Sequence, residues 1–113
     1  MEMKVHFHSD VFEIVKNGKK DIEVRINDEK RRKLNIGDTL VFLKRPLEDE
    51  EIRAKVVGLE YYDFFENLVD HYDMERIYLE GYTKEEYLNE MKRFYTREEQ
   101  EQYGVVAIIF EKE

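Results

Sequence analysis

Residues 18–32 read GKKDIEVRINDEKRR, and residues 36–42 read IGDTLVF. Within the first segment, Ile22, Val24 and Ile26 alternate with charged residues, a pattern that predicts a half-buried β-strand with one apolar face. The letters NDEKRRK that follow predict a charged turn or a short helix, and IGD predicts a turn into the strand TLVFLK. Two strands joined by a basic connection therefore form the centre of the predicted fold.

Further strands and helices are predicted on both sides of this centre. Alternation in residues 3–9 predicts a strand, and apolar spacing in residues 11–17 predicts a short helix. Residues 52–62 predict a long strand, residues 63–103 predict several helices, and residues 104–113 predict a central strand. Because five strands do not alternate regularly with helices, a doubly wound parallel sheet is excluded. We expect an α+β fold, a small mixed or antiparallel β-barrel with helices packed on one side and its last strand beside early ones.

The size and composition of the chain limit its class. Its 113 residues, 42% of them apolar, predict one folded domain over residues 1–113. The absence of cysteine excludes disulfides, thiolate metal sites and cysteine nucleophiles. The first residues show no leader, and no apolar run approaches the ~18 residues of a membrane helix. We therefore expect a cytoplasmic protein that makes no contact with membranes.

The charge of the chain is unevenly distributed. Residues 1–45 carry 11 Lys and Arg against 8 Asp and Glu, which gives +3, whereas residues 46–113 carry 8 against 19, which gives −11. A protein that holds a long nucleic acid by its backbone is usually basic throughout. The local excess of positive charge therefore predicts a short single-stranded RNA or a nucleotide as the ligand, and no DNA is expected.

Three segments of the chain resemble one known family. They read FEIVKNGKKDIEVRINDEKRRKLNIGDTLVF, YYDFFENLV and MKRFYTREEQEQYGVVAIIFE, and the first contains the pattern G-x-K-x-I-E-x-R. In this order they are similar to the small stand-alone ASCH proteins over nearly the whole chain. The resemblance implies a PUA-like barrel and, by analogy with PUA relatives, RNA binding. It also implies a cleft between the barrel and the first helix, lined by the GKK segment and the E-x-R strand.

The chain departs from its relatives directly after the second lysine. Many relatives have Thr at this position, where this chain has Asp21. A subset that resembles small amidohydrolases acting on acetylated cytidine carries the pattern K-T-x-T, and its proposed nucleophile falls at Glu23. Because a carboxylate does not replace a threonine hydroxyl as the attacking group on an amide, the departure argues against this activity.

Lys20, Glu23 and Arg25 are the principal candidates for ligand contact. Lys20 would act as a point charge at the mouth of the cleft, or as a general base if burial lowered its pKa. Arg25 would bind a phosphate or stack on a base, while Glu23 accepts a hydrogen bond from an exocyclic amine. The alternatives are a surface ion pair worth about 0–1 kcal/mol, or a buried structural pair beneath a covering helix.

Four further residues extend the predicted site. Lys19, Lys30 and Arg31 add positive charge that would steer an anionic ligand, although a charge run is more often a solvated face. Tyr61 would give a base a surface for stacking. The aromatic stripe within residues 87–95 is predicted instead to pack in the protein interior.

Metal and covalent chemistry have little support in the sequence. His6 and His8 share a strand face near Asp10, but a third ligand is not assured, so we expect no metal and no cofactor. The chain has only four Ser and Thr residues, and each has an ordinary role as a cap or strand residue. Covalent acyl transfer therefore has few nucleophiles available.

We thus expect an RNA- or nucleotide-binding domain. The alternative from another class is a small hydrolase, either an amidohydrolase on a modified nucleoside or a ribonuclease, with Lys20 and Glu23 as catalytic residues. A third hypothesis is a protein-interaction module that uses the acidic helical half. The expected ligand contacts are Lys19, Lys20, Glu23, Arg25, Lys30, Arg31 and Tyr61.

Overall fold

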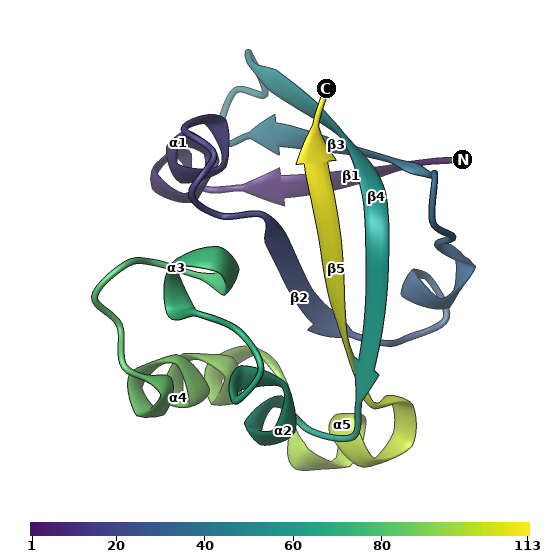
Figure 1. Ribbon diagram of the computed structural model, residues 1–113, viewed down its shortest axis with the longest axis vertical. Helices are drawn as coiled ribbons and strands as arrows, with labels where there is room; N and C mark the ends of the chain where they lie inside the picture. Colours follow the sequence, from purple (N-terminus) through teal and green to yellow (C-terminus); the bar gives the residue numbers. More distant parts are fainter.

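Five strands form one curled sheet in the computed structural model, which describes residues 1–113 (Figure 1). The strand order is β1-β3-β4-β5-β2, so the last strand lies between the fourth and the second. β1 runs parallel to β3, and the other three pairs are antiparallel. The mixed sheet and the return of the last strand confirm the predicted α+β architecture. The strands are β1 (Glu2–Phe7), β2 (Ile22–Ile26), β3 (Thr39–Lys44), β4 (Glu51–Tyr62) and β5 (Val105–Lys112).

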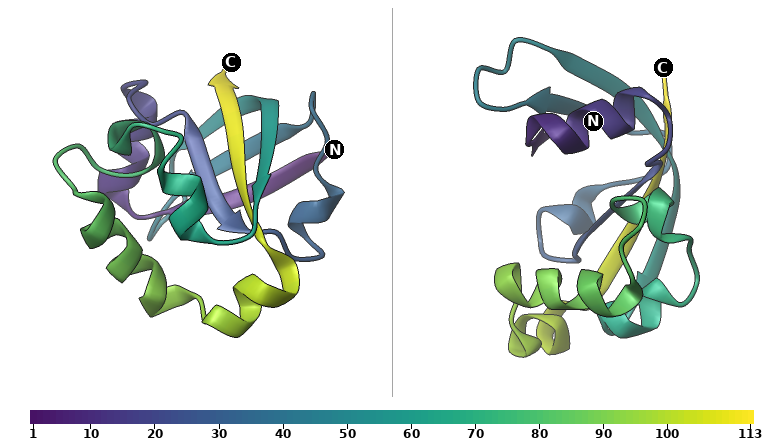
Figure 2. Two further views of the ribbon diagram at one scale, coloured as in Figure 1. Left: turned by 60° about the horizontal axis from the view of Figure 1, so that its bottom comes forward. Right: turned by 90° about the vertical axis from the view of Figure 1, so that its left-hand side faces the viewer.

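The helices occupy two places around the sheet (Figures 1 and 2). One helix follows β1 directly, and four short helices connect β4 to β5 and gather near the opposite end of the sheet. None of them combines the length and the hydropathy that a membrane crossing requires. The helices are α1 (Ser9–Lys16), the 3₁₀ helix η1 (Arg31–Lys33), α2 (Phe65–Val69), α3 (Met74–Ile77), α4 (Lys84–Phe94) and α5 (Arg97–Tyr103).

Two capping boxes fix the starts of the last helices. The Thr83 hydroxyl accepts a hydrogen bond from the Glu86 amide at 3.1 Å, and the Thr96 hydroxyl accepts one from the Glu99 amide at 3.1 Å. Each glutamate in turn accepts from the backbone amide of its threonine. These reciprocal bonds satisfy amides that have no partner within the helix, so α4 and α5 begin at defined residues.

Two apolar clusters lie on opposite faces of β5. Val106 and Ile108 belong to a cluster that includes residues of β1, β3, β4 and α1. Val105 and Ala107 belong to a second cluster, which includes residues of β2, α2, α3 and α4. Because successive strand residues point to opposite faces, β5 is the common wall of both clusters. This explains why residues 105–110 are continuously apolar.

β2 differs from the predicted half-buried strand because it is buried on both faces. Ile22, Val24 and Ile26 pack in the second cluster, as their alternation predicts. On the other face, Glu23 is only 6% exposed. β2 lies at an edge of the sheet and has only β5 as a strand neighbour, and α3 packs against it. Alternation identifies the polar face of a strand, but it does not show which later helix covers that face.

A glycine in β4 allows close contact with the neighbouring strand. The register of β4 against β5 shifts between Val56 and Gly58. A Cβ atom at Gly58 would lie 3.0 Å from Cδ1 of Ile109. The missing side chain therefore lets the two longest strands stay paired past the irregularity.

Candidate functional site

A cleft of about 480 Å³ opens beside the edge strand β2. β2 contributes Glu23 and Arg25, the end of β1 contributes His6 and His8, and α1 contributes Val11. The volume lies within the range of small-molecule sites in proteins. The aromatic residues of the opposite wall come from α4 and from the segments that flank α3 and α4, and they are Tyr78, Tyr87, Phe94 and Tyr95.

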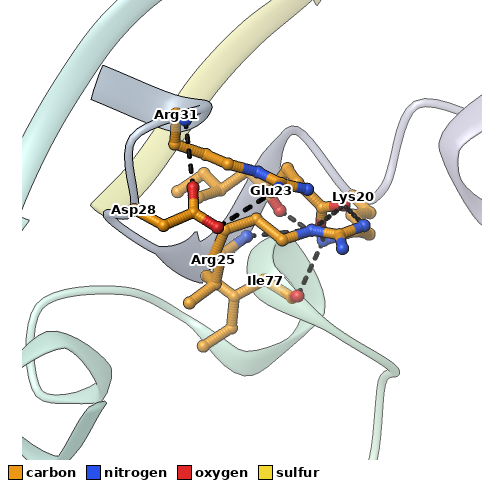
Figure 3. Close-up of polar contacts among 8 residues, drawn as sticks. Lys20, Glu23, Arg25, Asp28, Arg31 and Ile77 are labelled. Carbon is orange, nitrogen blue, oxygen red and sulfur yellow. Dashed lines mark hydrogen bonds and ion pairs between the residues drawn. The ribbon is translucent and has the colours of Figure 1, made fainter. Parts of the chain in front are cut away.

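Lys20 is buried beside this cleft, and its charge is turned into the protein. Its ammonium donates hydrogen bonds to the carbonyl of Ile22 and, at 2.8 Å, to the carbonyl of Ile77 in α3 (Figure 3). Its nitrogen also lies 3.5 Å from Oε1 of Glu23. Three acceptors surround the three N–H donors, and the residue is 3% exposed. Lys20 is therefore not at the mouth of the cleft, where we expected it.

Glu23 holds Arg25 through two hydrogen bonds that converge on one carboxylate oxygen. Its Oε2 accepts from Nε of Arg25 at 3.1 Å and from Nη2 at 2.8 Å. Its Oε1 accepts from the backbone amide of Val24 at 3.2 Å. The pair lies on one face of β2, and its burial matches the structural alternative more closely than the surface one. The carboxylate has few lone pairs left for a ligand amine.

The electrostatics of the three groups follow from this geometry. Burial lowers the pKa of Lys20, although the Glu23 charge opposes the change. Burial by itself would raise the pKa of Glu23, but the charges and hydrogen bonds of Arg25 and Lys20 outweigh it and lower that pKa. The Glu23 carboxylate raises the pKa of Arg25, with a smaller contribution from Tyr95. Glu23 and Arg25 are therefore held in their charged forms.

Arg25 is the member of this group with unused hydrogen-bond donors. Its Nε and Nη2 face Glu23, while its Nη1 is not engaged by that carboxylate, and Tyr95 is its other polar neighbour. Its side chain is 27% exposed and lines the cleft. A guanidinium that is fixed on one edge and free on the other is preorganised to bind a phosphate or a base carbonyl.

The other predicted site residues are not brought into this cleft. Lys19 is exposed and pairs with Glu80 at 3.0 Å. Arg31 lies 3.6 Å from Asp28 in the loop after β2, and Figure 3 shows this pair next to the Lys20 group. Lys30 is exposed, and Tyr61, near the end of β4, lines a different hollow. The predicted set therefore divides into a cleft group, a basic loop and a separate aromatic residue.

Asp21 ties α3 to the start of β2. Its two carboxylate oxygens accept from Nε and Nη2 of Arg76 at 2.8 and 3.2 Å. The Asp21 amide also donates to the Arg76 carbonyl at 3.2 Å. Together with the Lys20 bond to Ile77, these contacts fasten a four-residue helix to the sheet. The acidic residue at position 21 thus has a structural partner.

Sequence reasoning missed most of the aromatic wall of the cleft. The stripe in α4 was assigned to the interior, and Tyr87 is indeed buried. Phe94, however, is 64% exposed at the edge of the cleft, and Tyr95 is only partly buried. No signal in the sequence indicated this, because the five apolar residues recur at the spacing of one buried helix face, and Phe94 and Tyr95 lie where α4 ends.

The two histidines line the cleft without forming a metal site. Nε2 of His6 lies 2.6 Å from Oε1 of Glu48, in the loop between β3 and β4, and His8 is exposed. No group of three or more His, Cys, Asp or Glu side chains is placed to hold a metal ion.

A family model and several solved structures match the chain. A family model described as the ASCH domain matches residues 5–113. The crystal structure of hypothetical protein PH0355 is 31% identical, covers 100% of both chains and has a TM-score of 0.87. The solution NMR structure of protein PF0455 from Pyrococcus furiosus is 30% identical, covers 99% of this chain and 97% of that one, and has a TM-score of 0.79. No curated protein matches the chain.

Proposed function

The chain belongs to the ASCH domain family, within the PUA-like superfamily, and we propose that its cleft binds one nucleotide of a short single-stranded RNA. The same cleft would accept a free nucleotide, because the two ligands share a base, a ribose and a phosphate. The proposal concerns the group formed by Glu23, Arg25 and the aromatic wall.

The observation that carries this proposal is a free guanidinium edge and an aromatic wall in one cleft. Arg25 offers N–H donors that Glu23 does not occupy. Phe94 and Tyr95 offer aromatic surface in the same cleft. Stacking on an aromatic side chain contributes about 1–3 kcal/mol per base, and arginine suits the oxygens of phosphates and base carbonyls. A single nucleotide presents a base that can stack and oxygens that an arginine can bind, so this combination suits it.

The supporting role of Lys20 and Glu23 follows from their saturated hydrogen bonds. Glu23 orients Arg25, and Lys20 supports Glu23 from the protein interior. A direct contact from either residue to the ligand would require it to release a protein partner. We therefore assign ligand contact to Arg25 first, with Lys20 and Glu23 as positioning residues.

Amide chemical shifts of the labelled protein test the proposal directly. The ligands are a single-stranded hexaribonucleotide, the DNA oligomer of the same sequence and adenosine 5′-monophosphate, each at low and at moderate salt. We expect salt-sensitive shifts in residues 19–32 and 87–95 with both RNA and the mononucleotide, and weaker shifts with DNA.

A pair of arginine variants supplies the control. Arg25→Gln removes the free guanidinium edge, whereas Arg53→Gln removes an arginine that pairs with Glu2 and does not line the cleft. Only Arg25→Gln should weaken binding, by about tenfold or more. Equal effects of the two substitutions, or shifts confined to other surfaces, would contradict the nucleotide cleft.

One observation favours a second function, hydrolysis of a modified nucleoside or of RNA. Burial lowers the pKa of Lys20, which lies next to Glu23 in the wall of the cleft, and perturbed groups of this kind are candidates for acid–base catalysis. Incubation with acetylated cytidine and with the hexaribonucleotide, followed by chromatography, tests for products. An enzyme would lose turnover in Glu23→Gln while the shift changes on binding persist, and a binding domain gives no product with the unmodified protein.

A further inference from the structure

A second hollow, with a cavity volume of about 740 Å³, lies where β4 ends and α5 leads into β5. Residues 61–64 bound it on one side and residues 100–105 on the other. Asn27, directly after β2, and Asn67 in α2 complete its lining. None of these residues lines the cleft beside Arg25, so the two spaces are distinct.

Four side-chain amides line this hollow beside aromatic rings. Asn27, Asn67, Gln100 and Gln102 line it, and no lysine or arginine does. Gln100 is already engaged, because its Oε1 accepts from the Phe65 amide at 3.2 Å. By contrast, Oδ1 of Asn27 is buried and has no hydrogen-bond partner. A buried amide oxygen without a partner is stabilised when a group from outside the protein donates a hydrogen bond to it.

An exposed aromatic ring stands beside these amides. Tyr61 is 58% exposed, near the end of β4, where Glu60 is also exposed and Tyr62 is partly buried. Asp63 and Glu101 also line the hollow and would repel a phosphate. A neutral planar group with donors and acceptors on its edge suits this lining, since it stacks on the ring and pairs with amides. A nucleobase has these properties.

The strand register relates the hollow to the cleft. Arg25 of β2 and Tyr61 of β4 both pair with Val106 of β5. Their side chains therefore share one face of the sheet, and two strand spacings of about 4.8 Å separate their backbones by about 10 Å. Two adjacent nucleotides of one RNA strand span such a distance. One RNA strand would therefore reach both the cleft and the hollow without a change in the protein structure.

The basic loop after β2 lies next to the hollow. Arg32 donates from Nε to the Asn27 carbonyl at 2.8 Å and from Nη2 to the Tyr103 carbonyl at 3.3 Å. Its guanidinium carbon is 5.7 Å from the centre of the Tyr103 ring. The loop also carries Lys30, which is exposed. The loop therefore adds positive charge beside the hollow, and we expect this charge to offset that of a linking phosphate.

From these observations we infer that the second hollow is a base-binding subsite for a neighbouring nucleotide of the same RNA. Its base stacks on Tyr61 and forms hydrogen bonds with the amides of Asn27 and Gln102, while Arg32 and Lys30 face the linking phosphate. The inference rests on the proposed function, because it extends the ligand from the cleft. The cleft and the hollow would then bind one base each, and the residues that line them differ in chemistry.

Variants of Tyr61 separate this subsite from the cleft. Binding of adenosine 5′-monophosphate and of the hexaribonucleotide is measured by calorimetry for the unmodified protein, Tyr61→Ala and Tyr61→Phe. Tyr61→Ala should weaken the hexaribonucleotide about tenfold and leave the mononucleotide unchanged, while Tyr61→Phe keeps the ring and the affinity. The side-chain amide signals of Asn27 should shift with the hexaribonucleotide alone.

Each contrary result has a distinct meaning. If Tyr61→Ala binds the hexaribonucleotide as tightly as the unmodified protein while Arg25→Gln does not, the subsite is refuted and the nucleotide cleft stands. If Tyr61→Ala also loses the mononucleotide, the hollow is no separate subsite and the inference is refuted. If neither ligand binds the unmodified protein, the proposed function and the subsite fail together.

Discussion

Lys20 joins two parts of the chain that are far apart in sequence. Its ammonium bridges the carbonyls of Ile22 in β2 and Ile77 in α3. A buried charge without partners would cost several kcal/mol, and here two carbonyls and the Glu23 carboxylate compensate for it. Lys20, which the family resemblance marks as a ligand contact, therefore also helps to assemble the cleft.

Replacing this lysine should destabilise the protein even without any ligand. In Lys20→Met, two carbonyls and a buried carboxylate lose their donor, so the free energy of unfolding should fall by about 3 kcal/mol. Urea unfolding followed by circular dichroism measures the change. Lys19→Met is the matched control, because Lys19 is exposed and pairs only with Glu80, and its midpoint should stay unchanged. Similar midpoints for the two variants would contradict the buried role.

The loss of stability at low pH should depend on Glu23. Arg25 and Lys20 lower the pKa of Glu23 in the folded protein despite its burial. A carboxyl whose pKa is lower in the folded state stabilises the protein above its unfolded pKa of about 4.3, and this contribution disappears as the pH falls through the folded pKa. Glu23→Gln should therefore be less stable by about 2 kcal/mol at pH 7.

The difference in stability between the unmodified protein and Glu23→Gln should shrink on acidification. Urea midpoints at pH 7 and at pH 3 measure it, and Glu29→Gln, in an exposed turn, serves as the control at both values. A difference that stays constant between the two pH values would show that the Glu23 charge does not carry the effect.

At the scale of the elements, the apolar patterns predicted more of the structure than the polar ones. The strands were predictable because Ile22, Val24 and Ile26 alternate, and because residues 105–110 of β5 are all apolar. The burial of the polar face of β2 was not predictable, since the aromatic residues that line the cleft with Glu23 and Arg25 come from a distant segment. Residues close in sequence, such as Glu23 and Arg25, were placed together correctly, whereas Tyr61 depends on its neighbours in α5.

The cap of α5 supports one further prediction at this scale. Thr96 accepts from the Glu99 amide, and α5 carries Gln100, which holds the Phe65 amide. Thr96→Ala should lower the free energy of unfolding by about 1 kcal/mol, and Thr96→Ser should restore most of it. Urea unfolding gives the values. Equal losses for alanine and serine would show that packing of the methyl group, and not the cap, is responsible.

Across the whole molecule, the charge distribution restricts the ligand that the protein tolerates. The half that supplies β2 and the basic loop carries +3, and the remainder carries −11. Long polyanions would meet the acidic helices beyond the site, so RNA longer than the two base sites should gain little affinity. The sequence alone predicted this restriction, because it depends on counts of charged residues and not on their positions in space.

Salt should weaken RNA binding to a limited and predictable extent. With about three phosphate contacts, affinity for the hexaribonucleotide should fall about twentyfold when the salt concentration rises from about 50 to about 200 mM. Fluorescence anisotropy of a labelled hexaribonucleotide over this range gives the slope. A fall of more than a thousandfold would indicate many more phosphate contacts than the cleft and its loop provide, and no fall would exclude phosphate contact altogether.

The order of the strands has a consequence for how the protein is synthesised. β2 has β5 as its only strand neighbour, and β5 lies at residues 105–112. On the ribosome, residues 22–26 therefore emerge long before the strand that will hold them, and α3, which Lys20 fastens, also appears in between. A nascent chain that lacks β5 can pair β1, β3 and β4, but it leaves the strand that carries Arg25 unpaired. Ligand recognition thus begins only after translation has passed β5.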